Sequence, residues 1–213
     1  MVLNSVNCNY NFNSTEFRLI MNTSSLVTFA MLTSLIGLLS TASAATIVTS
    51  DGLGADTFIR QNLGTDNFGT SAVIEVKEDN SAFRRIGYLR YDLGASFTDQ
   101  SLIDDVSLSL TLNSSADVTF ELWGLNNGVS TDSRTDGIRW SETGLTWNNA
   151  DDGPGRLRSG DDPSTNFTSL GTFTLTSFDQ GDVITIGSTL SNADTSTGLA
   201  ANLENFLESD TNG

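Results

Sequence analysis

The stretch SLSLTL, residues 107–112, decides the fold class, because its leucines alternate with hydroxyl residues throughout. Leu108, Leu110 and Leu112 fall on one face of an extended chain, and the serines and the threonine fall on the other. A period of two residues is typical of a strand with one buried face. The stretch therefore predicts a β-strand in the wall of a hydrophobic core.

The following segment, DVTFELWGL (117–125), repeats the alternation with Val118, Phe120 and Leu122 on the inner face. The residues NSSA (113–116) between the two segments predict a hairpin turn. Further strand-like segments, separated by Gly, Asn, Asp and Ser, occupy residues 45–50, 56–60, 73–77, 87–93, 170–178 and 182–190. About eight short strands at this spacing predict an all-β fold, an antiparallel β-sandwich of the jelly-roll type.

One late segment departs from this pattern. In STGLAANLENFLES (196–209), Leu199, Leu203, Phe206 and Leu207 recur at helical spacing and form one apolar stripe. We expect an α-helix that packs across one end of the sandwich.

The N-terminal region differs in composition from the rest of the chain. LVTFAMLTSLIGLL (26–39) carries no charge, and small residues follow it at 42–44. An uncharged run of this length before small residues is typical of a secretory signal peptide, which we predict for residues 1–44. Because a signal peptide directs export, we expect a secreted, extracellular protein. Met21 is an alternative start of translation.

The predicted mature part, residues 45–213, ends in DTNG. Asn-Gly is a strong turn signal, and no strand follows it here. We therefore expect a module that is truncated at its C-terminus.

Composition narrows the range of functions. The only cysteine is Cys8, in the predicted leader, and the chain has no histidine. These absences exclude disulfides, thiolate zinc sites and serine–histidine catalysis from the mature part. A net charge of −16, from 26 acidic and 10 basic residues, disfavours nucleic acid and anionic membranes as partners. The acidic residues are spread too evenly to single out a catalytic pair, so we do not expect an enzyme.

Three motifs in order resemble a known family. They are ADTFIRQNLGTDNFGTSAVIEVK (55–77), FRRIGYLRYDL (83–93) and GLTWNNA (144–150). The chain resembles the DNRLRE-type domain, the family 96 carbohydrate-binding module, from about residue 45 to residue 213. The resemblance implies a secreted β-sandwich that binds polysaccharides without catalysis, with acidic polymers such as alginate as one target class. Such modules are often attached to polysaccharide lyases.

The arginines suit an acidic polymer. Arg84 and Arg85 precede a predicted strand, so we expect them at a rim of the sandwich. A guanidinium group binds the carboxylate of a uronic acid better than an ammonium group does. The alternative is that both arginines form ion pairs with acidic side chains. The candidate ligand-binding residues are Arg60, Asn67, Lys77, Arg84, Arg85 and Trp123.

Aromatic side chains lead to two further expectations. Trp123 is out of phase with Leu122, so we expect it on the outer face of its strand, where it can serve as a sugar platform. In RQNLGTDNFGTS (60–71), we expect a structural turn in which Phe68 points inward. The alternative for this loop is a place at the ligand rim. Trp147 is expected to pack in the core or against a loop.

Calcium is the cofactor to consider, because loop carboxylates are its usual ligands. Asp151, Asp152, Asp161 and Asp162 flank a turn, but no stretch has the spacing of a known calcium loop. The sequence therefore assigns no cofactor, and calcium stays a candidate without a position. A structural or adhesive surface module without sugar binding remains the alternative function, as does an accessory part of a polysaccharide lyase.

Overall fold

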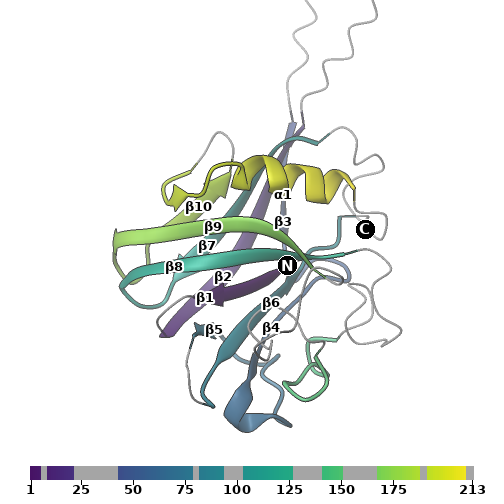
Figure 1. The fold of residues 1–213 in the computed structure, drawn as a ribbon. Helices are drawn as coiled ribbons and strands as arrows, with labels where there is room; N and C mark the ends of the chain where they lie inside the picture. The colour runs from purple at the N-terminus through teal and green to yellow at the C-terminus, as the bar shows by residue number, and fades with distance from the viewer. Residues whose placement is uncertain are drawn as a thin grey trace, which may run out of the picture.

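The computed structural model describes residues 1–5, 9–21, 43–78, 82–93, 103–126, 141–150, 167–187 and 191–209. This part of the chain forms an antiparallel β-sandwich with one α-helix (Figure 1). The elements are β1 (Val2–Ser5), β2 (Asn9–Met21), β3 (Ser43–Val48), β4 (Ala55–Arg60), η1 (Gln61–Leu63), β5 (Ile74–Lys77), β6 (Arg85–Arg90), β7 (Ile103–Leu112), β8 (Ala116–Leu125), β9 (Phe167–Phe178), β10 (Val183–Gly187), β11 (Asp194–Thr195) and α1 (Leu199–Glu208). Within these ranges, no helix has the length and apolar character needed to cross a bilayer.

Hydrogen bonds join the strands in the order β10-β7-β2-β5-β6-β1-β8-β9-β11, with β3 beside β2 and β4 beside β6. Every segment that the sequence predicted as a strand is a strand, and the all-β prediction is confirmed. Leu108, Leu110 and Leu112 are each fully buried, as their alternation predicted. Three strands were not predicted: β1 and β2 lie in the segment assigned to a signal peptide, and the two polar residues of β11 give no periodic signal. The hairpin predicted at 113–116 is wrong, because β7 pairs with β2 and β10, whereas β8 pairs with β1 and β9.

Two hydrophobic clusters hold the strands together. The main cluster lies inside the sandwich and includes Leu108, Phe120 and Phe173. The second cluster consists of Ala55, Ile59, Ile86, Tyr88, Leu145, Ala150 and Phe167. Strand β6 lies between the two, because its Leu89 belongs to the main cluster and its Ile86 and Tyr88 belong to the second. Both faces of β6 are therefore buried.

The helix α1 lies across β7, β9 and β10 at one end of the sandwich, as predicted (Figure 1). Its Leu199, Leu203 and Leu207 are buried in the main cluster, and Phe206 packs against that cluster while remaining half-buried. The apolar stripe read from the sequence is therefore the face that covers the core.

Two segments near the start of the chain, residues 2–5 and 9–21, take part in the sheet. Strand β2 pairs with β3, β5 and β7, and β1 pairs with β6 and β8. The apolar run 26–39 of the predicted signal peptide lies outside the described residues, as do residues 210–213. Removal of residues 1–44 stays a prediction, and in the full chain part of that segment is paired as strand.

The packing of α1 yields a stability prediction. We expect Leu203→Ala to lower the free energy of unfolding by about 2–5 kcal/mol, because the side chain is fully buried and its loss leaves a cavity. Denaturant titration followed by circular dichroism measures this change. Ala201→Ser, at an exposed position of the same helix, is the control. Equal midpoints for both variants would contradict the packing of α1 against the core.

Candidate ligand-binding surfaces

Three of the candidate residues form a row across the ends of three strands. Arg60 ends β4, Arg85 begins β6 and Lys77 ends β5. Arg60 pairs in register with Arg85, and Arg85 pairs in register with Lys77. Residues in register on neighbouring strands share a face, and the strands lie about 4.8 Å apart. We call Arg60, Arg85 and Lys77 the basic row.

The three residues of the basic row differ in their contacts within the protein. The Arg85 Nη1 lies 2.9 Å from the Glu75 Oε2. The Arg60 Nε donates a hydrogen bond of 2.7 Å to the Asn62 Oδ1, and Arg60 makes no ion pair among the described residues. The Lys77 Nζ lies 5.8 Å from the ring centroid of Phe83, which is 46% exposed. The row therefore combines positive charge with an aromatic surface.

Arg84 lies beside the row rather than in it. Its Nη2 forms an ion pair with the Glu78 Oε1 at 2.5 Å. The ion pairing that we considered for Arg84 and Arg85 is therefore present for both. Arg84 is in register with neither Arg60 nor Lys77. An arginine outside the row can therefore be compared with the arginines inside it.

Asn67 holds two loops together. Its Nδ2 donates hydrogen bonds to the carbonyl oxygens of Glu142 and Leu145, each at 2.8 Å, and its Oδ1 accepts one from the Gly69 backbone at 3.0 Å. A Cβ at Gly69 would overlap with the Glu142 carbonyl, so only glycine permits this approach. The hydrogen-bonding capacity of the Asn67 amide is thus used within the protein.

Phe68 points inward, as expected for a structural turn. Its ring stacks on the ring of Phe58 with a centroid distance of 4.4 Å. Both rings contribute to the main cluster, Phe58 as a buried member and Phe68 as a partly buried neighbour. Phe68 therefore anchors the loop 60–71 to the main cluster, and Asn67 joins it to the loop 141–150.

The two tryptophans near this region pack against the second cluster. Trp123 lies on the face of β8 opposite Leu122, as expected, and that face is covered in part by the second cluster. Trp147 also packs there, as predicted. Both side chains remain half-buried rather than presenting a free ring to solvent.

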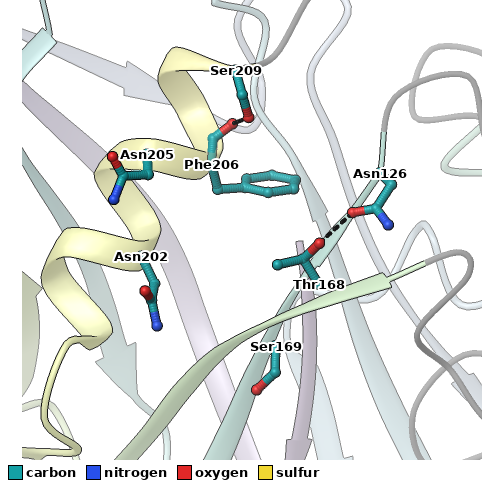
Figure 2. A pocket seen from close by; sticks show the side chains of 7 residues that line it. All are labelled: Asn126, Thr168, Ser169, Asn202, Asn205, Phe206 and Ser209. Carbon is teal, nitrogen blue, oxygen red and sulfur yellow. Dashed lines mark hydrogen bonds between the residues drawn. The ribbon is translucent and has the colours of Figure 1, made fainter.

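A separate hollow of about 270 Å³ lies between α1, the end of β8 and the start of β9. We call it the amide pocket; its lining residues are Asn126, Thr168, Ser169, Asn202, Asn205, Phe206 and Ser209. Figure 2 shows the Phe206 ring reaching from α1 toward Asn126 and Thr168. A Cβ at Gly124 would overlap with this ring, so glycine allows the ring to lie against β8. No local sequence signal predicted this pocket.

Hydrogen bonds fix some polar groups of the amide pocket and leave others available. The Thr168 Oγ1 donates to the Asn126 Oδ1 at 2.6 Å, and the Asn202 Nδ2 donates to the Leu170 carbonyl at 3.0 Å. The Asn126 Nδ2 and the Asn202 Oδ1 form no hydrogen bond with the part of the chain described here. The Asn205 amide likewise has no partner there. The pocket therefore offers oriented donors and acceptors.

The described ranges contain no group of three or more Asp, Glu, Cys or His side chains that could hold a metal ion. The calcium candidates Asp151, Asp152, Asp161 and Asp162 lie outside the described residues. Calcium therefore stays a candidate cofactor that these residues do not test.

Glu142 is the one carboxyl group in the loop 141–150. Burial raises its pKa above the ordinary value of 4.5, the negative charge of Asp56 raises it further, and Arg90 opposes the shift. The Asp56 carboxylate accepts a hydrogen bond of 2.5 Å from the Thr49 hydroxyl. The two loops that Asn67 joins therefore meet beside two carboxylates and one guanidinium group, those of Glu142, Asp56 and Arg90.

A family model described as carbohydrate-binding module family 96 matches residues 49–180. The match spans strands β4 to β9 and includes the basic row. Neither the curated proteins nor the solved structures contain a significant match.

The position of Asn67 yields a prediction about stability. We expect Asn67→Ala to lower the free energy of unfolding by about 1–3 kcal/mol, because two carbonyl oxygens lose their donor. Thermal unfolding measures the change. Asp66→Ala in the same loop is the control, since Asp66 is exposed. A melting temperature of Asn67→Ala equal to that of the control would show that the two loops are held together otherwise.

Glu142 yields a prediction about pH. A carboxyl group with a raised pKa in the folded state opposes folding once it ionises, so its effect begins as the pH rises above 4.5. We expect Glu142→Gln to be more stable than the unmodified protein at neutral pH and equally stable below about pH 4. Urea titrations across this range measure the difference. If Glu142→Gln loses stability relative to the unmodified protein as the pH rises from acid to neutral, the raised pKa of Glu142 is refuted.

Proposed function

Because the chain belongs to carbohydrate-binding module family 96, we propose that it is an exported, non-catalytic module whose basic row binds uronate polymers such as alginate. The observation that supports this proposal is the register of β4, β6 and β5, which brings Arg60, Arg85 and Lys77 onto one face. Sequence spacing alone separates these residues by as many as 25 positions.

The chemistry of the basic row matches a polymer that carries carboxylates at regular intervals. A guanidinium group offers two parallel donors to one carboxylate. The Arg60 guanidinium has no acidic partner among the described residues, so it is the side chain best suited to this contact. The exposed ring of Phe83 next to Lys77 offers an apolar surface to the face of a sugar ring.

The overall charge makes the contact dependent on salt. With a net charge of −16, the protein repels a polyanion over most of its surface, and the basic row provides local attraction. Screening weakens the attraction between exposed charges. Added salt is therefore expected to weaken binding at the basic row. Binding through sugar hydroxyl groups and aromatic rings would depend little on salt.

Support for export comes from the sequence, where the uncharged run 26–39 precedes small residues at 42–44. Support for a binding role without catalysis comes from the family, whose description is that of a binding module. A structural or adhesive role is the outcome that remains if no polysaccharide binds.

We expect Arg60→Ala to weaken alginate binding about tenfold, equivalent to roughly 1.4 kcal/mol, because a charge-assisted contact is lost. Lys77→Ala is expected to act in the same direction. Affinity electrophoresis in gels that contain alginate, with calorimetry on oligouronates, measures both effects. Arg84→Ala is the matched control, because it removes the same charge at a position beside the row.

Two results would overturn this proposal. One is the failure of alginate and pectin to retard the unmodified protein at low salt. The other is an equal loss of affinity in Arg84→Ala and Arg60→Ala, which would indicate a general charge effect. Release of unsaturated products or new reducing ends during incubation would instead indicate an enzyme.

A further inference from the structure

We propose that the amide pocket is a second glycan-binding site, separate from the basic row, and that it takes one uncharged sugar ring. The basic row belongs to strands β4, β5 and β6, whereas the pocket is lined by α1, the end of β8 and the start of β9. Figure 1 shows α1 on the side of the sandwich away from β4, β5 and β6. The inference rests on the proposed function only in taking a glycan as the ligand.

The composition of the pocket favours a sugar over an apolar ligand. Six of the seven lining residues carry an amide or a hydroxyl group, and the seventh is Phe206. A side-chain amide presents one donor and one acceptor at a fixed spacing, which suits a pair of adjacent ring hydroxyls. The Phe206 ring supplies the flat apolar surface that the face of a pyranose requires. Small-molecule pockets span about 300–1,000 Å³, so a hollow of about 270 Å³ suits a single ring.

The electrostatics of the pocket favour an uncharged ring. None of its lining residues is ionisable. Asn205, Phe206 and Ser209 lie at the C-terminal end of α1, where the helix dipole is negative, and the last turn carries no basic residue. Glu208 is exposed on the same turn. A carboxylate in this position would meet negative potential and no cation.

Two amides and the aromatic ring of the pocket are preorganised for binding. The Thr168 hydroxyl fixes the Asn126 amide, and the Leu170 carbonyl fixes the Asn202 amide. The Phe206 ring rests against Gly124, where a larger residue would displace it. A ligand therefore loses little free energy in ordering these groups.

The experiment compares neutral and acidic polymers on the full chain. We expect galactomannan, xylan or a mixed-linkage glucan to retard the unmodified protein in affinity electrophoresis, with little dependence on salt. Asn205→Ala and Asn126→Ala are expected to weaken that binding about fivefold or more, equivalent to roughly 1 kcal/mol each, and to leave alginate binding unchanged. Arg60→Ala is expected to do the opposite.

A charge reversal tests the selectivity directly. Glu208→Lys is expected to let oligouronates compete for the pocket, detected as broadening or shifting of the side-chain amide signals of Asn205 in nuclear magnetic resonance spectra. Asp66→Lys, which makes the same charge change at an exposed residue in the loop after β4, is the control and is expected to have no such effect.

The outcomes separate this inference from the proposed function. The second site is refuted if no neutral polymer binds, or if both asparagine variants still bind neutral polymers. Alginate binding at the basic row is tested separately by Arg60→Ala. If the asparagine variants weaken alginate binding as much as neutral binding, the pocket is not a separate site. If uronates bind the unmodified pocket as well as neutral sugars do, the selectivity is refuted.

Discussion

The structure depends on one constraint, which is that strand β6 buries both of its faces. Leu89 fills the main cluster from one side, while Ile86 and Tyr88 fill the second cluster from the other. A strand of this kind needs strand partners along both edges and packed side chains above and below. Strands β4 and β5 pair with β6, and the loop 141–150 contributes Leu145 to the second cluster. The charged residues that begin or end these strands are consequently held at fixed positions.

The second cluster explains why two loops distant in the chain meet. Leu145 is fully buried, so the segment around it has to lie against the sandwich. The backbone groups beside Leu145 then need hydrogen-bond partners, since buried carbonyl oxygens are costly when unpaired. Asn67 supplies two of those hydrogen bonds. The glycine- and asparagine-rich composition of residues 60–71 thus reflects close packing between loops.

Most single strands and the helix after residue 44 were predicted correctly from the sequence. The contacts between these elements were predicted poorly. The alternation in β7 and β8 and the stripe of α1 were strong local signals, because each depends on residues only two to four positions apart. The two-sided burial of β6 was not predicted, since Tyr88 shares its face with Arg90, and a charged residue interrupts the apolar pattern of that face. The basic row depends on register between three strands, and the amide pocket depends on where α1 meets β9. Neither depends on spacing along the chain.

The partners of β2 have a consequence for how the chain reaches its folded state. Ser14 pairs with Thr111, so the sheet is completed only when the beginning of the chain meets a segment from its middle. Pairing between distant segments is slow, and an unpaired strand edge invites aggregation in the meantime. If the first 44 residues were cut away, β7 would keep β10 on one side and lose the hydrogen-bond partners that β2 gives it on the other. The timing of cleavage relative to folding would then determine whether the sandwich closes with its own first strands or has to recruit another strand to cover β7.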